Sequence, residues 1–215
     1  MNQAASLVRA IRWVAIGALF VGAALAHGDQ LEPASRPALE ALFLCQAADK
    51  LPVSERAAAL ANGLDCAERA VKADPQDAAA HFAIFCNLGK QIQFEQHKLW
   101  VLARLGDLDR ARRELDIALE LAPDYVGAVA AKGEMLIELP AFLGGDAQEG
   151  ERLLRHAVVL DPDDPHIRIM LANLLQATGR HEEARTHAEV ALAILERTGP
   201  SPDMDGARTL IAGSK

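Results

Sequence analysis

The segment "HEEARTH", from His181 to His187, brings together residue types that could bind zinc. A zinc-protease helix carries two histidines four positions apart, with a Glu beside the first that acts as general base. Here the residue four positions after His181 is Arg185, and the second histidine comes six positions on. Residues six apart on a helix point to different faces. The segment therefore predicts a solvated helix surface rather than a metal site.

Acidic residues surround two prolines in "LDPDDP", where Asp161, Asp163 and Asp164 could hold calcium. A calcium loop of the EF-hand type also needs a Gly for its turn and a Glu at its last position, and neither stands at the required offset. The same acids are what a helix end followed by a newly capped helix requires. We therefore expect a helix boundary here.

No other motif in the sequence indicates catalysis or a cofactor. The stretch "LGGD" is not followed by the Gly-Lys-Ser/Thr of a phosphate-binding loop. A GxSxG nucleophile motif is also absent from the sequence. The prediction is a protein that is not an enzyme and that binds no cofactor or metal.

The elements that must position any site are predicted to be helices. Of the 215 residues, 51% are hydrophobic and only 4% are aromatic, which is enough apolar surface for one domain with a sizeable core. Ala and Leu are abundant with charged residues between them, and no convincing run of alternating β-branched residues is present. The predicted fold class is all-α.

The first 26 residues differ from the rest and have the parts of a signal peptide. Arg9 and Arg12 form a basic start, residues 13–25 are apolar, and an Ala-Leu-Ala sequence precedes the expected cut. An uncleaved anchor is the alternative, but the apolar run is shorter than the roughly 20 residues that span a bilayer. We expect 1–26 to be removed, which leaves a periplasmic or secreted chain with no membrane segment.

The charge of the remaining chain is strongly negative. Removal of the first 26 residues takes away two of the 22 Lys and Arg residues and none of the 30 Asp and Glu residues, so the net charge falls from −8 to about −10. Such a surface repels phosphate backbones and anionic lipids. Nucleic acid is therefore not an expected partner, whereas a basic protein or a neutral apolar ligand is compatible.

Three cysteines, Cys45, Cys66 and Cys86, lie in the first half of this chain. An oxidising compartment would permit one disulfide and leave an odd thiol. Each cysteine also stands in a helical pattern, where Cys is often a small buried apolar residue. Buried, unpaired thiols are the favoured interpretation, and one disulfide is the alternative.

Three segments of the chain end alike, with an Ala five residues before a Pro. They are "AVKADP" at 70–75, "ALELAP" at 118–123 and "AVVLDP" at 157–162. The tetratricopeptide repeat ends in this way, because its second helix packs a small residue against its neighbour and then breaks at Pro. The sequence therefore resembles a tetratricopeptide-like helical-repeat array, a superhelix of paired α-helices.

The resemblance is most complete in the last unit, a 34-residue repeat that begins at Pro165. The matching positions are a large-then-small pair, a turn glycine and two small packing residues: Leu171, Ala172, Gly179, Ala184 and Ala191. This unit predicts two helices separated by a tight turn.

The second and third units are enlarged. From Pro75 to Pro123 is 48 residues, and from Pro123 to Pro162 is 39 residues, against a norm of about 34. The excess in the second unit is close to four helical turns, so its first helix is expected to be long. The excess in the third unit falls in the turn between its two helices.

The enlarged turn of the third unit contains two apolar residues, Phe142 and Leu143. Pro140 is expected to end the first helix, and the double glycine that follows allows Asp146 to cap the second. The two apolar side chains could tuck under neighbouring helices as a plug, which is the favoured interpretation. The alternative is a part in binding a ligand or partner.

The chain on either side of these units is less regular. Residues 37–48 and 54–73 are expected to form a first helix pair, separated by "DKLPV". Residues 199–215 are rich in Gly, Pro and Ser and are expected to form a flexible C-terminal tail. The repeat domain is therefore predicted to cover 27–198.

Tetratricopeptide arrays bind along the concave surface built by the first helix of each pair. The resemblance implies that repeat positions 2, 5 and 9 face this groove. With the apolar pair of the wide turn, the predicted site residues are Phe82, Cys86, Ala130, Glu134, Phe142, Leu143, His166, Ile169 and Asn173. A groove with Glu134 as its main charge suits an apolar segment or ligand better than an anion.

A closer resemblance rests on several features together. The signal peptide, the long first helix of the second unit, and the runs "ALELAPDYVGAVAAKGEML" and "LPAFLGGDAQEGERLLRHAVVLDPDD" resemble the periplasmic T component of tripartite ATP-independent transporters, over roughly residues 70–195. In that family a Pro followed by Gly-Gly-Asp introduces the next repeat helix. The resemblance implies a protein that assembles with a periplasmic solute-binding protein and carries an apolar ligand.

The favoured function is a periplasmic scaffold for protein–protein interaction, including the case of a transporter accessory. One alternative is a carrier of a small apolar ligand, motivated by the aromatic residues of the second unit: Phe82, Phe85, Phe94 and Trp100. Most such aromatic side chains are simply core. Another alternative is a generic scaffold for envelope assembly.

Overall fold

The computed structural model describes residues 34–94, 105–199, 201 and 203–213. In these residues the regular elements are helices, and consecutive helices pack against each other in pairs. The pairs are α3 (Arg36–Ala47) with α4 (Val53–Ala73), α5 (Ala78–Phe94) with α7 (Leu105–Leu121), α8 (Val126–Glu138) with α9 (Ala147–Leu160), and α10 (Pro165–Ala177) with α11 (His181–Thr198). The prediction of an all-α array of helix pairs is confirmed.

The helix boundaries follow local rules. Asp164 caps α10, because its Oδ1 accepts hydrogen bonds from the backbone N–H groups of His166 at 2.7 Å and Ile167 at 3.2 Å, and Pro165 suits the first helical position. Gly179, with φ +79°, makes the left-handed turn between α10 and α11. The acids near Pro162 and Pro165 thus form the helix boundary that the sequence predicts.

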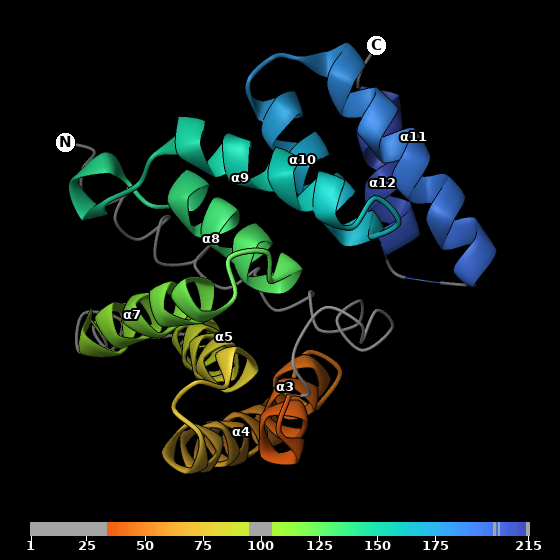
Figure 1. The fold of residues 1–215 in the computed structure, drawn as a ribbon. Coiled ribbons are helices and arrows are strands. Elements are labelled where there is room, and N and C mark those ends of the chain that lie inside the picture. The colour runs from red at the N-terminus through yellow and green to blue at the C-terminus, as the bar shows by residue number, and fades with distance from the viewer. Residues whose placement is uncertain (1–33, 95–104, 200, 202, 214–215) are drawn as a thin grey trace, which may run out of the picture.

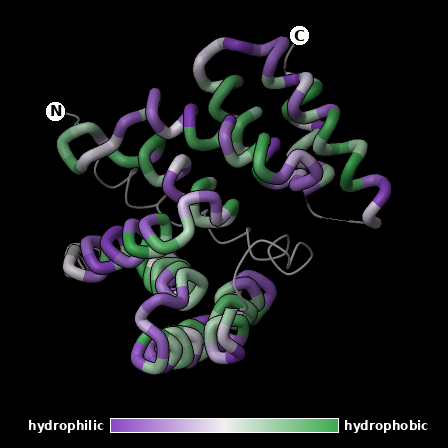
Figure 2. Tube along the Cα trace, in the orientation of Figure 1, coloured by the Kyte–Doolittle hydropathy of each residue, from purple (hydrophilic) through white to green (hydrophobic). Residues whose placement is uncertain are grey.

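The pairs follow one another along a curved array, from α3 and α4 at one end to α10, α11 and α12 at the other (Figure 1). Along each helix hydrophobic and hydrophilic residues alternate in patches, as amphipathic helices require (Figure 2). The largest core cluster draws on α3, α4, α5, α7 and α8. A second cluster joins α8 and α9 to α10 and α11, so the core runs along the array.

The first pair and the third unit agree with the sequence analysis. Helices α3 and α4 begin and end within one residue of the predicted 37–48 and 54–73, which is the usual uncertainty of helix ends. The extra residues of the third unit form a short 3₁₀ helix, η2 (Ala141–Leu143), in the turn between α8 and α9. The first helix of the second unit, α5, has 17 residues, against 13 in each of α8 and α10, as the prediction of a long helix requires. The following segment 95–104, with Trp100, and the predicted signal peptide 1–26 lie outside the described residues.

The C-terminal segment differs from the flexible tail expected at 199–215. Residues Asp203–Gly213 form a helix, α12, which packs against α11 and α10. Its Ala207 and Leu210 are buried, and Leu210 joins Ala172 and Ala188 in a third small core cluster. The run of Gly, Pro and Ser residues at 199–202, which suggested a flexible tail, precedes this helix in the sequence.

Candidate interaction surface

The first two predicted groove residues, Phe82 and Cys86, belong to the core. Their exposed fractions are 0% and 3%. The Phe82 ring stacks on Phe85, with 5.9 Å between ring centroids, and meets the Tyr125 ring edge-on at 5.0 Å. A Cβ on Gly127 would lie only 3.1 Å from the same ring. Helix α8 thus closes over these side chains, and the prediction that they line an open groove is corrected.

The third predicted residue, Ala130, is also fully buried, in the cluster that joins α8 to Ile167 and Leu171 of α10. One helical turn beyond Ala130 stands Glu134, which is only half-buried. Glu138 follows after another turn, so the two carboxylates share one face of α8. Among residues 34–94, 105–199 and 203–213, neither forms an ion pair with a cation.

The surroundings of these two carboxylates disfavour negative charge. Burial raises the pKa of Glu134 to about 8, and the neighbouring Glu138 carboxylate adds to the increase. Burial also raises the pKa of Glu138. A carboxyl group in such a place is satisfied either by a proton or by an incoming cation. Glu134, a predicted groove residue, and its neighbour Glu138 are therefore the chemically distinctive feature of this face of α8.

The wide turn between α8 and α9 is held tightly. The Arg112 side chain of α7 donates from Nη1 to the backbone oxygen of Leu143, at 2.7 Å. Gly144 adopts φ +84°, which a side chain would disfavour. A Cβ on Gly145 would fall 1.7 Å from the carbonyl oxygen of Leu139. Gly144 is therefore required by its left-handed backbone conformation, and Gly145 by the close approach of the Leu139 carbonyl group.

The two apolar residues of this turn have different surroundings. Leu143 packs against the large core cluster, as the plug interpretation predicts. Phe142 leaves 67% of its surface exposed, so the plug interpretation is wrong for that residue. The wide turn thus presents one aromatic ring to solvent beside a fixed backbone.

The last three predicted residues lie on α10, and α12 reaches two of them. His166 approaches Asp203 at the start of α12, with 3.5 Å between Nδ1 and Oδ2. Ile169 packs against the small cluster that contains Leu210 of α12. Asn173 is exposed. Helix α12 thus covers this end of the array, and of the three residues only Asn173 is exposed.

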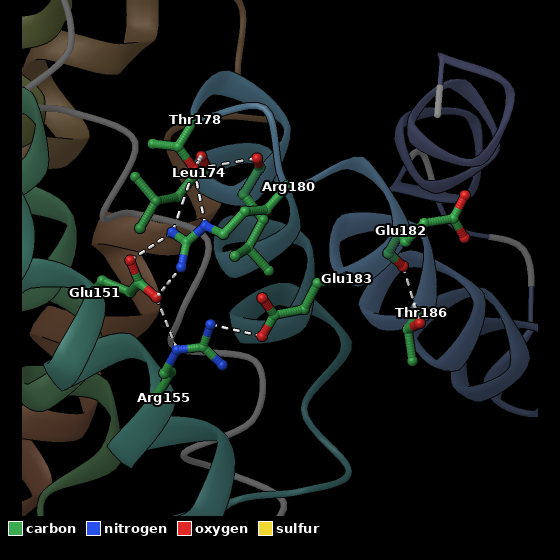
Figure 3. A network of polar contacts seen from close by, with 9 residues as sticks. Glu151, Arg155, Leu174, Thr178, Arg180, Glu182, Glu183 and Thr186 are labelled. Atoms are coloured by element: carbon green, nitrogen blue, oxygen red, sulfur yellow. Dashed lines mark hydrogen bonds and ion pairs between the residues drawn. The ribbon is translucent and has the colours of Figure 1, made fainter. Parts of the chain in front are cut away.

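A polar network that the sequence analysis did not identify joins the third unit to the fourth (Figure 3). Glu151 of α9 accepts two hydrogen bonds from the Arg180 guanidinium, at 2.7 and 2.5 Å, and one from Nε of Arg155 at 2.8 Å. Arg155 also pairs with Glu183 of α11, at 2.6 Å. The two guanidinium groups lower the pKa of Glu151 to about 2. The network fixes the turn before α11 on the surface of α9.

The contact between α8 and α9 is made by two glycines. A Cβ on Gly133 would lie 2.9 Å from the carbonyl oxygen of Gly150, and a Cβ on Gly150 would lie 2.6 Å from that of Gly133. The predicted site residues include neither glycine. With the five extra residues of the third unit placed in the turn before α9, Gly150 occupies the small packing position of the second helix.

The histidines of 181–187 and the acidic residues around Pro162 do not form a metal-binding cluster in the described residues. In the described residues there is no group of three or more His, Cys, Asp or Glu side chains arranged to hold a metal ion. The His181 ring contacts Gln176, at 3.1 Å. Of the helices that the structure describes, none is long and apolar enough to cross a membrane.

Comparison with known proteins agrees with this architecture. Residues 141–205 match the sequence model of the tetratricopeptide repeat family. A solved structure of a thermophilic TPR protein from Thermus thermophilus superposes with a TM-score of 0.55, covering 92% of this chain and 96% of that one at 19% sequence identity. The fold is a tetratricopeptide-like repeat array. Proteins of this fold generally mediate protein–protein interaction.

One curated relative is similar in sequence. The chain is 30% identical to the cellulose synthase 2 operon protein C of Komagataeibacter xylinus, over an alignment that covers 50% of this chain and 10% of that protein. The chain thus corresponds to about a tenth of the length of that relative. The role of that relative belongs to a much longer protein, of which the aligned part is about a tenth.

Proposed function

We propose that this protein is a periplasmic scaffold that binds a protein partner on α8, with Glu134 and Glu138 as the anchor for a cationic side chain of that partner. The observation that carries the proposal is a half-buried carboxylate pair without an ion-pair partner among the described residues. An Arg or Lys from a partner would supply the missing charge in a partly desolvated place, where such a pair is specific.

The raised pKa of Glu134 makes the proposed interaction dependent on pH. With a pKa of about 8, this group is largely protonated at neutral pH and must lose its proton to pair with a cation. Binding therefore releases a proton, and the affinity should rise as the pH increases from about 6 to about 8.5. An anchor of ordinary pKa would show no such dependence in this range.

The compartment and the identity of the partner are further parts of the proposal. The signal-peptide pattern of residues 1–26 supports a location outside the cytoplasmic membrane. The resemblance to the transporter T component supports a solute-binding protein as the partner and a role as a transporter accessory. A role beside another envelope assembly is the broader form of the same proposal.

The test is capture of partners from periplasmic extract by the immobilised protein, followed by mass spectrometry. Wild type is compared with Glu134→Gln/Glu138→Gln and with a charge-matched control, Glu182→Gln/Glu196→Gln, whose side chains are exposed on α11. We expect one protein to be retained by wild type and control, and its affinity to fall at least about tenfold in the α8 variant, as for the loss of a buried charge contact.

Two outcomes would contradict parts of this proposal. If the captured protein binds both double variants equally, the α8 carboxylates are not its anchor. If a partner is captured but is not a solute-binding protein, the transporter role fails and the envelope-scaffold role stands.

The alternative of an apolar-ligand carrier has lost its main support. It rested on the aromatic side chains of the second unit, and Phe82 and Phe85 are both buried among protein neighbours. Phe94 lies under the Arg56 guanidinium, which sits 4.7 Å from the ring centroid. These contacts give the three aromatic side chains a packing role.

A further inference from the structure

Helices α3 and α5 are joined by two buried polar bonds that define their relative position. The Asn87 side chain of α5 donates from Nδ2 to the backbone oxygen of Ala41, at 3.1 Å. One turn further on, the Lys90 ammonium donates to the backbone oxygen of Cys45, at 2.7 Å. Both donors are almost fully buried, with exposed fractions of 0% and 1%. The segments around Cys45 and Cys86 are therefore held side by side.

The two cysteines lie within this contact. Cys86 directly precedes Asn87 in the sequence, and Cys45 is itself one of the two residues contacted. Both side chains belong to the same core cluster, with exposed fractions of 0% for Cys45 and 3% for Cys86. Burial, with the nearby Cys45 thiol, raises the pKa of the Cys86 thiol. The structure holds both as free thiols.

We propose that Cys45 and Cys86 are a disulfide site that links α3 to α5 when the chain folds in an oxidising medium. Both cysteines lie in the packed contact between α3 and α5, the first helices of consecutive pairs, so folding brings them into one interface. The bridge would close a loop that contains all of α4.

The third cysteine is placed differently. The Cys66 sulfur accepts a hydrogen bond from the Arg69 guanidinium, at 3.0 Å, and Arg69 is largely exposed. Cys66 thus stands on α4 with a partner at the protein surface. It is expected to stay a thiol and serves as the internal control.

The chemistry needs a disulfide-bearing oxidant, such as oxidised glutathione or a protein disulfide oxidoreductase. One cysteine thiolate attacks a sulfur of the oxidant and expels a thiolate, which forms a mixed disulfide. The second cysteine then attacks that mixed disulfide and expels the remaining thiolate. The two cysteines lose two protons and two electrons in total, and the oxidant becomes two thiols. Because both sulfurs are buried in the folded chain, the exchange takes place before α3 docks on α5.

Formation of this bridge inside the cell rests on the proposed export, whereas its formation in the test tube does not depend on compartment or partner. The full chain is unfolded and reduced, then refolded either with reductant or with a mixture of oxidised and reduced glutathione. Each sample is unfolded again in N-ethylmaleimide, which labels every free thiol. Intact-mass and peptide mass spectrometry then count the labels and identify any bridged pair.

We expect one label, on Cys66, after oxidative refolding, and a bridged peptide pair that contains Cys45 and Cys86. The unlabelled refolded protein should be lighter by about 2 Da than the reduced form, the mass of two hydrogen atoms. Its thermal midpoint should be higher by about 5 °C or more, because the bridge limits the unfolded chain. The Cys66→Ala variant should form the same bridge.

Three labels after oxidative refolding, in protein whose circular dichroism is that of the folded chain, would overturn the proposal. A bridge that includes Cys66 would also overturn it. These results are independent of partner capture, so failure of the scaffold function and failure of the disulfide are distinguishable. Direct peptide mapping of wild type makes the test independent of whether any cysteine variant folds.

Discussion

At the scale of single residues, two glutamates of the third unit show how neighbours set the chemistry of one residue type. Glu134 lies among groups that disfavour its charge, and its pKa is raised to about 8. Glu151 lies between two guanidinium groups, and its pKa is lowered to about 2. The same carboxyl group is thus poised to accept an external cation at one site and already satisfied by internal cations at the other.

The first prediction concerns Glu134→Gln. The folded-state pKa of Glu134 lies above its unfolded value of 4.5, so the stability that its proton supplies is complete below about pH 4.5 and is lost as the pH rises through about 8. A Gln at this position does not titrate, so the variant does not lose this stability. In urea unfolding between about pH 6 and 9, the free energy of unfolding of the variant minus that of wild type should increase with pH, by at most about 1.4 kcal/mol per pH unit. Parallel curves would contradict the burial of this group, and Glu196→Gln is the exposed control.

The second prediction concerns Glu151→Gln and has the opposite sign. The folded-state pKa of Glu151 lies below its unfolded value, so its contribution is present above about pH 4.5 and is lost as the pH falls towards 2. The variant should unfold with about 1–2 kcal/mol less free energy at pH 7, and the gap should close near pH 2. A comparison with Glu149→Gln, which removes an exposed pair with Arg152, should show little change at either pH.

At the scale of elements, two glycines, which have no Cβ, allow the close spacing of α8 and α9. Gly133 and Gly150 face each other's carbonyl oxygens, and no Cβ fits between them. The wide turn that joins the two helices is held by Arg112 and by the double glycine that ends η2. The carboxylate face of α8 is thus oriented by close helix contact on one side and by a rigid turn at its end.

The third prediction is that Gly150→Ala forces α8 and α9 apart. Its Cβ would lie 2.6 Å from the Gly133 oxygen and from Cγ1 of Ile137, and overpacking of this kind costs about 1–3 kcal/mol. Gly206→Ala on α12 is the matched control, because a Cβ there meets nothing within 4 Å and alanine favours the helix by about 0.5–1 kcal/mol. Chemical denaturation of both variants checks the contrast, and equal stability would refute the close approach.

At the scale of the whole molecule, helix α12 covers the end of the array formed by α10 and α11. Helix α12 packs against α10 and α11 and buries apolar residues that would otherwise face water. Repeat arrays need such a terminal cover because each unit stabilises only its neighbours. The same helix contacts His166 and Ile169, so the surface available to a partner is shifted from α10 towards α8.

The fourth prediction is that a chain ending at Gly199 loses this cover. Removal of α12 exposes Ala172, Ala188 and part of Ile169, and should lower the free energy of unfolding by about 2–4 kcal/mol. Hydrogen exchange in α10 and α11 should increase more than in α3 and α4, because the effect passes through neighbouring units. Uniform exchange rates along the array would show that α12 is not a structural cover.

Much of this architecture could be predicted from local pattern alone. The Ala-to-Pro spacing, the Asp164-Pro165 helix start and the turn glycine Gly179 each act within a few residues of their own position, so the pairs and their boundaries could be predicted. The wide turn followed from Pro140 and the double glycine for the same reason. Helix caps and left-handed turns depend on neighbours in sequence, and a single sequence contains those neighbours.

The candidate site depended instead on contacts between units. Repeat numbering placed Phe82 and Cys86 in an open groove, but Tyr125 and α8 close over them. The burial that raises the pKa of Glu134 and the placement of Cys45 and Cys86 in one core cluster likewise depend on packing between helices. Which polar groups are buried, and against what, is decided by long-range packing. Only the folded array brings those partners together, because burial and charge act through space rather than along the sequence.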